Sequence, residues 1–594
     1  MNHLDTCATS LVALRPSALL GLFKEVLDSS LVERGALQGI ELLGPADGFW
    51  RQVRLAELKR MAAGGNSAAQ AEMAWRYASG AGVGRNSTEA MRWAARSAES
   101  GCGAGEAALG WLLYHGLGAP RDHPEAARLL ALAAGKGERR GLDVLARCHF
   151  FGRGVAENRA EAVRLWQLAA ESGVAAAMFA CGLCLYSGEG VSANRERALL
   201  WFRSAAEQGL SGAMFMLGQC HFFGMGVAAD RAAGVEWYRR AAEAGSREAA
   251  CELGELHANG RDGVQANLRE ALRWWRQAGR LGHARACLKI AHCYRWGDGV
   301  TEDKPLALAW YRRAVNAGDT HANVWLGECL EQGIGTRVDL ALALDHYRAA
   351  ANAGDHHGLA ELGRCTLHGI GTNADPAAGE AMLRSAAEAG WNSALGELER
   401  YWFARGERLL NGHPARPEQA VDCYRKAAEL GHRRAALMLA ECLRHGFGGE
   451  PDLPQAIVWY RKAATLFDAK IALGDMYFYG WGVARSEREA LRWYEQAVAQ
   501  HEDAYAMYSL GYCLLHGRGT HSDPESGLRW LRRSAELGEI DAQYELGSAY
   551  YRGAGAPARR QLAMKWLRSA AALGHARAQA FLERMTIGNA HGLN

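Results

Sequence analysis

The sequence predicts an all-α protein, an α/α superhelical solenoid of about 14 antiparallel helix pairs with a period of 36 residues. Two observations lead to this fold class. One glycine recurs at steps of 36 or 37 residues over long stretches of the 594-residue chain, and a fixed period of this length indicates stacked repeats. The chain also holds 71 Gly and only 12 Pro, in segments with helical apolar spacing, so glycine is expected to end helices. The recurring glycines are Gly80, Gly116, Gly152, Gly188, Gly224, Gly260, Gly297, Gly333, Gly369, Gly446, Gly480, Gly517 and Gly553, with a degenerate unit around Gly406.

Each repeat is expected to contain two helices. The first ends at the turn glycine, as in AAMFACGLCLYSGEGV (176–191), and the second ends at a further glycine, as in RERALLWFRSAAEQG (195–209). A small residue inside the first helix, such as Gly182, lowers helix propensity and therefore predicts a close approach between helices. A tryptophan recurs in the second helix, as at Trp201, and its burial is expected to hold each hairpin to its neighbour.

This repeat pattern resembles that of the Sel-one-like repeats, which are glycine-rich relatives of tetratricopeptide repeats. The shared pattern is A-x-x-x-L-G-x-x-Y-x-x-G-x-G-V, followed by a Trp/Tyr-bearing helix that closes with A-A-E-x-G. AMYSLGYCLLHGRG (506–519) and ALRWYEQA (490–497) match it well, and the resemblance covers roughly residues 66–585. It implies an α/α solenoid that serves as a protein-binding scaffold, with partners that differ between members.

The domain boundaries follow from the places where the repeat pattern fails. Pro414 and Pro417 lie beside Gly412 and are expected to form a loop that interrupts stacking. The first 65 residues hold apolar helical segments without the full repeat and are expected to cover the apolar face of the first repeat. The predicted parts are an N-terminal helical cap (1–65), a first repeat block (66–393), an irregular repeat and junction (394–430), a second repeat block with a C-terminal capping helix (431–585) and a frayed tail (586–594).

Composition argues against several classes of function. The 68 basic and 65 acidic residues give a formal net charge of +3, whereas a nucleic-acid binder carries a strong basic excess. No segment has the apolar length of a membrane span. Asp5 and Arg15 interrupt the pattern of an export signal. The protein is therefore expected in the cytoplasm, with no nucleic-acid partner and no membrane span.

Cysteine is expected to pack as a small apolar residue. Eight cysteines occupy one repeat position, four residues before the turn glycine. Neighbouring helices lie roughly 8–10 Å apart, beyond the span of a disulfide, so reduced thiols are expected. Cys181 and Cys184 form a C-x-x-C pair that lacks the context of a redox or zinc site. The eight are Cys148, Cys184, Cys220, Cys293, Cys329, Cys365, Cys442 and Cys513.

Other chemical candidates are also weighed against structural roles. Asp355, His356, His357 and Glu361 could offer metal ligands on one helical turn. Histidines recur at helix starts, however, where they are expected to cap the helix or face solvent. The Gly-x-Gly turns lack Gly-Lys-Ser/Thr and follow helices rather than strands, unlike phosphate-binding loops. No catalytic, cofactor-binding or metal residue and no small-molecule substrate is therefore predicted. The helix-start histidines are His283, His432 and His575.

The predicted partner-binding residues lie nine, five and two positions before the turn glycine. These positions share one face of the first helix, and by analogy with tetratricopeptide arrays that face lines a concave groove. Exposed aromatic clusters in such a groove are typical of interaction hot spots. The alternative is a narrow groove in which the rings pack on one another. The predicted residues are Trp75, Trp111, Tyr114, Phe150, Phe179, Tyr186, Phe215, Phe222, His292, Arg295, Glu328, Arg364, Arg444, Phe478, Tyr508, Tyr512, Tyr544 and Tyr551.

The predicted function is a non-catalytic interaction scaffold that holds a partner protein or extended peptide in the groove. One alternative is an accessory protein of envelope polysaccharide synthesis or export, which would require a signal peptide or lipidation motif. A second alternative is a cell-wall enzyme, which would require a catalytic constellation. Neither feature is evident in the sequence.

Overall fold

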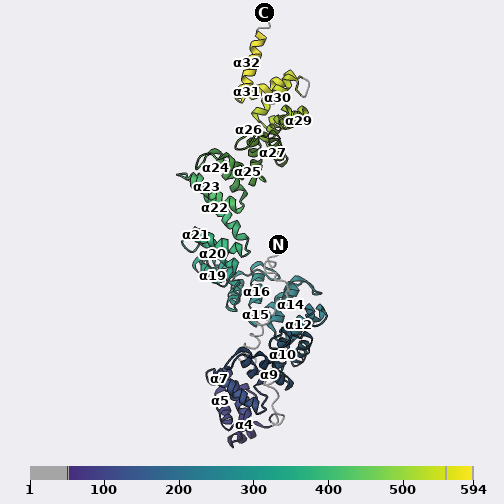
Figure 1. Ribbon diagram of the computed structural model, residues 1–594, viewed down its shortest axis with the longest axis vertical. Helices are drawn as coiled ribbons and strands as arrows, with labels where there is room; N and C mark the ends of the chain where they lie inside the picture. The colour runs from purple at the N-terminus through teal and green to yellow at the C-terminus, as the bar shows by residue number, and fades with distance from the viewer. Residues whose placement is uncertain (1–49, 51–52, 555–557, 591–594) are drawn as a thin grey trace. The chain divides into compact units, whose positions relative to one another are not determined.

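The computed structural model describes residues 50, 53–554 and 558–590. It divides into two compact units, one that runs to Ala353 and one that begins at Gly354. In the described part there are 30 helices and no strand, which confirms the predicted all-α solenoid. Figure 1 shows the helices following one another in chain order along each unit.

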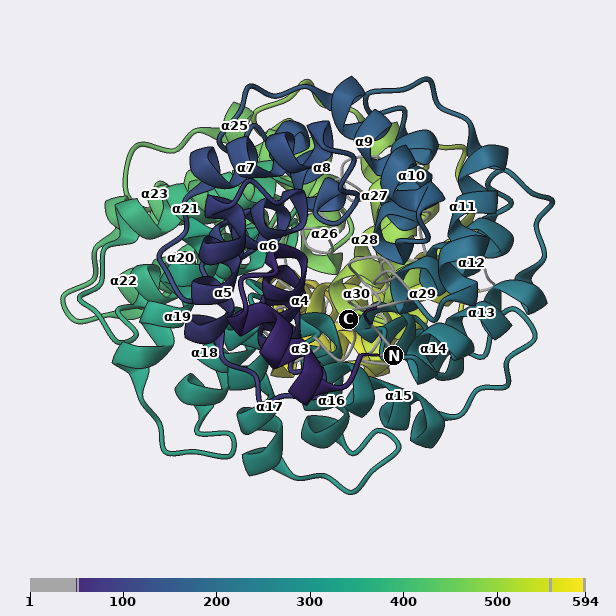
Figure 2. The same ribbon diagram turned by 90° about the horizontal axis from the view of Figure 1, so that it is seen from below.

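The first unit contains the short helix α3 (Leu55–Ala63) and eight helix pairs. In Figure 2 the first helices of these pairs lie on the inner side of a curve and the second helices on its outer side. The first helices are α4 (Ser67–Ser79), α6 (Gly103–His115), α8 (Leu142–Phe151), α10 (Ala175–Ser187), α12 (Ser211–Phe223), α14 (Arg247–Asn259), α16 (Ala284–Trp296) and α18 (Ala322–Gln332). The second helices are α5 (Ser87–Glu99), α7 (His123–Gly135), α9 (Arg159–Glu171), α11 (Arg195–Glu207), α13 (Arg231–Glu243), α15 (Leu268–Arg280), α17 (Lys304–Asn316) and α19 (Leu340–Asn352).

The second unit contains six helix pairs and a final helix, α32 (Ala576–Ala590). The first helices are α20 (His356–His368), α22 (Ser393–Asn411), α24 (Arg433–His445), α26 (Phe467–Tyr479), α28 (Ala504–His516) and α30 (Ile540–Arg552). The second helices are α21 (Pro376–Glu388), α23 (Pro417–Leu430), α25 (Leu453–Lys462), α27 (Glu487–Gln500), α29 (Pro524–Glu536) and α31 (Arg560–Ala572).

The Gly-x-Gly turn joins two repeats as well as two helices. Gly188 ends α10 in the left-handed conformation, with φ of 82°, and its amide donates to the Cys184 carbonyl at 2.8 Å. Gly190 lies against the start of α9 in the preceding repeat, where a Cβ would be 2.5 Å from the Arg159 carbonyl oxygen. Left-handed backbone and close contact each favour glycine. Packing therefore explains both glycines without a phosphate.

The glycine in the middle of a first helix lies against a ring or a leucine of the second helix. A Cβ on Gly182 would be 2.5 Å from the ring of Phe202, and a Cβ on Gly474 would be 2.3 Å from that of Tyr494. The predicted close approach of the two helices is therefore confirmed. The fully buried ring, Phe202, follows the recurring Trp201, which is only half-buried. This corrects the expectation that the tryptophan is the buried residue.

The recurring tryptophan lies at the contact between repeats, as expected, but it is half-buried at each repeat except at Trp459, which is 8% exposed. A Cβ on Gly279 of α15 would be 3.2 Å from the ring of Trp310 in the next repeat. The outer side of the ring is covered by a basic side chain, with the Arg313 guanidinium 5.1 Å from the Trp310 centroid. A half-buried position suits an indole ring, since one side packs on apolar surface and the other holds a cation.

Asparagine, aspartate or serine begins most of the second helices. The Asn194 side chain accepts the Arg197 amide at 2.9 Å, and Asp303 does the same for Leu306 at 2.9 Å. Such N-caps satisfy an otherwise unpaired helix amide and contribute about 0.5–2 kcal/mol each. The capping residue recurs with the repeat, so local sequence sets where each second helix begins.

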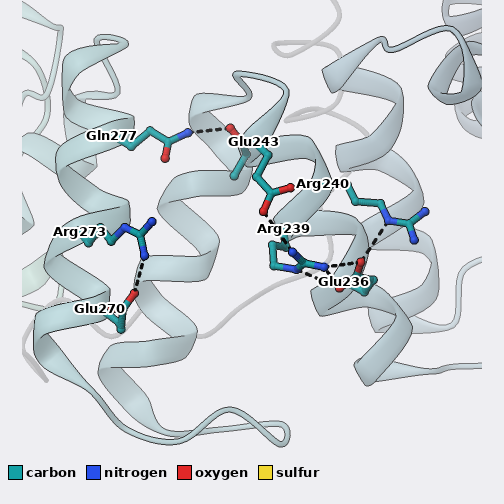
Figure 3. A network of polar contacts seen from close by, with 8 residues as sticks. Glu236, Arg239, Arg240, Glu243, Glu270, Arg273 and Gln277 are labelled. Atoms are coloured by element: carbon teal, nitrogen blue, oxygen red, sulfur yellow. Dashed lines mark hydrogen bonds and ion pairs between the residues drawn. The ribbon is translucent and has the colours of Figure 1, made fainter.

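The second helices present ion pairs to solvent. On α13, Glu236 pairs with Arg239 at 2.8 Å and with Arg240 at 3.1 Å, and these side chains are 41–55% exposed (Figure 3). Exposed pairs contribute only about 0–1 kcal/mol each. The Gln277 amide donates to the Ala242 carbonyl at 2.6 Å and joins α15 to α13 (Figure 3). The outer face is therefore mainly a solvent-exposed charged surface, and a few hydrogen bonds on it join neighbouring repeats.

Most of the predicted N-terminal cap, residues 1–49, lies outside the described residues. Its last helix, α3, packs on the first repeat, where Leu58 and Ala62 are buried against Ala69 and Met73 of α4. An apolar contact of this kind covers the open end of a repeat array.

The predicted junction forms a helix pair. Helix α22 has 19 residues, compared with 13 in α10, so the extra residues lengthen a helix. A Cβ on Gly406 would be 2.7 Å from the Tyr424 ring, which places Gly406 in the middle of the helix and the turn at 412–416. The structure divides between Ala353 and Gly354 and not within 394–430. The boundary between two repeat blocks at 394–430 stays a prediction. Limited proteolysis tests it, because the first cut is expected there.

Candidate partner-binding surface

The eight inner-face aromatic residues predicted in the first unit are buried, each at most 6% exposed. Phe150 packs on Trp166 with ring centroids 5.3 Å apart, and Phe215 packs on Tyr238 at 5.7 Å. Trp166 and Tyr238 belong to second helices, so these contacts lie within a repeat, whereas Trp75 and Trp111 pack on each other at 5.7 Å. A partner-binding role for these rings stays a prediction, and the burial of the rings favours a structural role. The eight are Trp75, Trp111, Tyr114, Phe150, Phe179, Tyr186, Phe215 and Phe222.

The polar residues predicted at the end of the first unit form an internal cluster. The Arg295 guanidinium donates to both carboxylate oxygens of Glu328 at 3.0 and 2.7 Å. It also lies 4.9 Å from the ring centroid of Trp296 and 5.5 Å from that of Trp325. His292 stacks on Trp296 at 4.9 Å. His292 and Arg295 are buried, so this cluster stabilises the unit rather than offering a free surface.

Two predicted basic residues of the second unit are also engaged within the protein. Arg364 donates to Glu361 at 2.7 Å. The Arg444 guanidinium lies 5.2 Å from the ring centroid of Trp481.

The predicted C-terminal residues include three that line one open pocket. Phe478 of α26 and Tyr508 and Tyr512 of α28 lie in its wall, and the pocket has a volume of about 500 Å³. Tyr544 and Tyr551 do not line it. Tyr544 stacks on His575 with centroids 4.5 Å apart, and Tyr551 meets Phe581 edge to face at 5.2 Å. We call this cavity the tyrosine pocket. It is lined by Phe478, Tyr479, Tyr494, Tyr505, Tyr508, Ser509, Tyr512, Cys513, Asp541, Glu545, His575, Ala576 and Arg577.

The pocket belongs to a series of rings in contact, which we call the C-terminal aromatic surface. Each ring centroid lies 4.7–6.2 Å from the next. Tyr479 is 54% exposed and Trp481 38%, and the other four rings are half-buried. Unlike the eight predicted rings of the first unit, the rings of this series are thus accessible to a partner. In order the series is Trp481, Tyr479, Phe478, Tyr512, Tyr508 and Tyr505.

Carboxylates lie in and behind the tyrosine pocket. The hydroxyls of Tyr494 and Tyr505 donate to the same oxygen of Asp475 at 2.8 and 3.1 Å. Asp541 and Glu545 are themselves part of the lining. Burial raises the pKa of Tyr508, and these two carboxylates raise it further, so the phenol stays neutral at physiological pH.

His575 fixes one side of the pocket. Its Nδ1 accepts the Ala578 amide at 3.1 Å and so caps α32. The proton must then sit on Nε2, which donates to Asp541 at 3.0 Å. A neutral histidine in this tautomer orients the carboxylate and leaves its charge in place.

Several residues of this surface escaped the sequence analysis. Tyr479 and Tyr505 fall outside the three inner-face positions, and Trp481 stands between the two glycines of a turn. An aromatic residue between the two turn glycines was the sequence feature that could have predicted an exposed ring. Phe447 holds the same place in the preceding turn and is 54% exposed. No sequence feature could have predicted Asp541, because only the packing of α30 against α32 brings this residue to the pocket.

The other chemical candidates have structural roles. The eight cysteines of the repeat position are at most 2% exposed, as the packing hypothesis predicted, and burial raises the pKa of Cys513 to about 12. Asp355 caps α20 by accepting the Gly358 amide at 2.9 Å, and His357 stacks on Trp391 at 4.4 Å. No cluster of three metal-ligand side chains occurs among the residues that the structure describes. The helix-start histidines cap helices as expected, with His283 and His432 accepting amides at 3.2 and 3.0 Å.

Comparison with known families identifies the repeats. A family model described as Sel1 repeat matches 14 consecutive segments. The chain belongs to the Sel1 repeat family. This confirms the resemblance and the number of repeats, including one across the irregular region. The segments are 67–102, 103–138, 144–174, 175–210, 211–246, 247–283, 284–319, 320–355, 356–391, 394–432, 433–466, 467–501, 504–539 and 540–575.

Curated relatives share only part of the array. Chitin synthase regulatory factor 3 of Schizosaccharomyces pombe is 33% identical over 135 residues, which is 21% of this chain and 14% of that protein. The Sel1-repeat-containing protein YjcO of Escherichia coli is 27% identical over 128 residues, 20% of this chain and 56% of that protein. In both cases the chain covers less than two thirds of the relative. The similarity therefore concerns the repeats and not the whole proteins.

Solved structures with Sel1 repeats are also similar. A protective antigen of uropathogenic Escherichia coli with an SLR fold is 25% identical, with a TM-score of 0.46 over 89% of this chain and 97% of that one. A Sel1 repeat protein from Oxalobacter formigenes is 29% identical, with a TM-score of 0.37 over 41% of this chain and 97% of that one. Within the described residues no helix is both long and apolar enough to cross a bilayer.

Proposed function

We propose that the protein is a non-catalytic interaction scaffold that binds a partner protein or extended peptide on the C-terminal aromatic surface. The observation that carries this proposal is the unbroken series of accessible rings from Trp481 to Tyr505 on neighbouring first helices. Exposed, clustered Tyr and Trp side chains are enriched at interaction hot spots, because they offer a large contact area at low conformational cost.

The extent of the surface favours a polypeptide partner. The rings come from α26, the following turn and α28, so they span two repeats, and the pocket is open at one end of the series. A chain that lies along the series would contact each ring in turn and place one side chain in the pocket. A small molecule confined to the pocket would leave Trp481, which does not line it, without contact.

Other features support a role without catalysis. Cys513 is the thiol in the pocket wall, and a pKa of about 12 keeps it protonated and a poor nucleophile. His575 is occupied as a helix cap and as a partner of Asp541. We further propose a cytoplasmic location. Cell fractionation tests it, since envelope location would favour the alternative in polysaccharide synthesis or export. Binding of labelled penicillin tests the second alternative, a cell-wall enzyme, and failure to bind would reject it.

The function is tested by partner capture. The full chain is used as bait in a lysate, the captured proteins are identified by mass spectrometry, and a purified partner is then titrated. Replacing Tyr508 and Tyr512 with Ala is expected to weaken binding by about thirtyfold, which corresponds to about 2 kcal/mol for a hot spot. Unchanged affinity in this variant would reject the proposed surface.

The matched control removes apolar side chains elsewhere on the second unit. Val458 and Leu537 are 43% and 50% exposed and lie outside the aromatic series. Their replacement with Ala is expected to leave affinity within about twofold, since isolated surface residues contribute little to binding.

A further inference from the structure

The tyrosine pocket combines aromatic rings with negative charge. Tyr505, Tyr508 and Tyr512 have neighbouring ring centroids 6.2 and 6.0 Å apart. Asp541 and Glu545 line the same cavity. Its volume of about 500 Å³ is enough for a long side chain and part of its backbone, within the usual size of ligand sites. Aromatic faces with nearby carboxylates attract cations.

The buried Asp475 strengthens this preference. Its carboxylate accepts both the Tyr494 and Tyr505 hydroxyls. Burial raises the pKa of Asp475, and these two donors lower it by stabilising the carboxylate. A phenol that donates to a carboxylate carries more electron density on its ring, so the rings of Tyr494 and Tyr505 present a more negative surface to the pocket than isolated tyrosines would.

The histidines beside the pocket leave this charge in place. His575 donates one proton to Asp541 and accepts a backbone amide, so it is neutral. His516 lies 3.4 Å from Glu545 and is about a third exposed. Among the described lining residues the one permanent cation is Arg577, whose side chain is exposed. The lining therefore carries two carboxylates, Asp541 at 53% and Glu545 at 16% exposure, against one guanidinium.

The first unit shows which group suits rings on this face. Arg153 lies 6.0 Å from the ring centroid of Tyr114, and Arg195 lies 5.3 Å from that of Tyr186. In those repeats the protein's own arginine covers the ring. In the described part of the second unit, no arginine or lysine of the chain lies over Tyr505, Tyr508 or Tyr512. Tyr114 and Tyr186 lie two positions before the turn glycine, and the second-unit ring at that position, Phe478, also carries an arginine, with Arg485 5.9 Å from its centroid. The three tyrosines of the pocket lie at other positions of the repeat, so their faces remain available to a cation from a ligand.

We infer that the tyrosine pocket receives a basic side chain, arginine or lysine, of the polypeptide that lies on the C-terminal aromatic surface. This inference rests on the proposed function and specifies the chemistry of the partner. The cation would stack on Tyr508 and Tyr512 while its charge is balanced by Asp541 and Glu545. The partner's recognition segment would therefore be basic at this position.

The test measures binding of four blocked pentapeptides to the full chain. Each has alanine at four positions and arginine, lysine, citrulline or glutamate at the centre. Citrulline matches arginine closely in shape but is neutral. Calorimetry gives the affinity, and 3-fluorotyrosine NMR, assigned with Tyr→Phe variants, gives the location. We expect the arginine and lysine peptides to bind at least tenfold more tightly than the citrulline peptide and to shift the Tyr508 and Tyr512 signals.

Charge variants complete the test. Glu545→Gln, alone and combined with Asp541→Asn, is expected to weaken the arginine peptide at least tenfold. The single variant Glu545→Gln leaves the contact between Asp541 and His575 intact, so its effect cannot be due to loss of that contact. Thermal melting checks that both variants are folded. Asp422→Asn with Glu418→Gln makes the same charge change on exposed positions of α23 and is expected to have no effect.

Three results would overturn the inference. They are equal binding of the citrulline and arginine peptides, tighter binding of the glutamate peptide through Arg577, and no binding of any peptide up to about 10 mM, where even a site of millimolar Kd is largely filled. Failure of the proposed function can be distinguished from failure of this inference. In that case capture of the natural partner would be insensitive to replacement of Tyr508 and Tyr512. If capture depends on these rings but not on charge, only the basic-side-chain inference fails.

Discussion

The two units carry aromatic rings at the same repeat positions but differ in what covers them. Phe215 of the first unit is 4% exposed and packs on Tyr238, whereas its counterpart Tyr508 is half-buried and lines an open pocket. Both rings stand nine residues before the turn glycine. The difference shows that the repeat position specifies which face a ring lies on, and that its neighbours decide whether the ring is buried or accessible.

The largest expected effect separates these two roles. Phe215→Ala should lower the free energy of unfolding by about 3–5 kcal/mol, because it leaves a cavity beside Tyr238. Tyr512→Ala should cost about 1 kcal/mol, since its ring is only half-buried. Urea unfolding followed by circular dichroism measures both. Equal losses in the two variants would contradict the distinction between the units.

The next effect tests a feature that the units share. Gly474→Ala places a Cβ 2.3 Å from the Tyr494 ring, and Gly218→Ala places one 2.5 Å from the Tyr238 ring. Overpacking of this kind costs about 1–3 kcal/mol. Both variants should therefore unfold more easily, and only Gly474→Ala should also disturb the tyrosine pocket, because Tyr494 lines it. Thermal melting and peptide titration give the two readouts.

The control for this pair is a helical glycine without a close neighbour. A Cβ on Gly135 meets nothing within 4 Å, so Gly135→Ala should stabilise the protein by about 0.5–1 kcal/mol through helix propensity. A loss of stability in this variant would mean that the effects at Gly218 and Gly474 are not due to ring contact.

The smallest effect concerns pH. Burial lowers the pKa of His283 from 6.5 to about 4, and its unprotonated Nδ1 caps α16. Between these values the unfolded chain binds more protons than the folded one, so stability should fall as the pH drops from 6.5 to 4. His283→Asn keeps a cap that does not titrate and should remove most of this dependence. Unfolding curves at pH 7 and pH 4.5 for both proteins measure it, and an unchanged dependence would contradict the cap.

By itself the sequence determined the fold class, the period, the helix pairs and the turn glycines, because each depends on local features that recur. Left-handed glycine, an Asn or Asp N-cap and apolar spacing act within a few residues of one another. The face on which Tyr508 and Tyr512 lie was predictable for the same reason, since helical geometry fixes it.

Only the tertiary structure decided which rings are buried and where the candidate site lies. Trp201 and Phe202 are adjacent aromatics, and the contact with Gly182 makes Phe202 the buried one. Likewise the pocket needs Tyr505 from α28, Asp541 from α30 and His575 at the start of α32. These residues come together through the stacking of successive repeats, and that stacking depends on the sum of many contacts rather than on any local pattern.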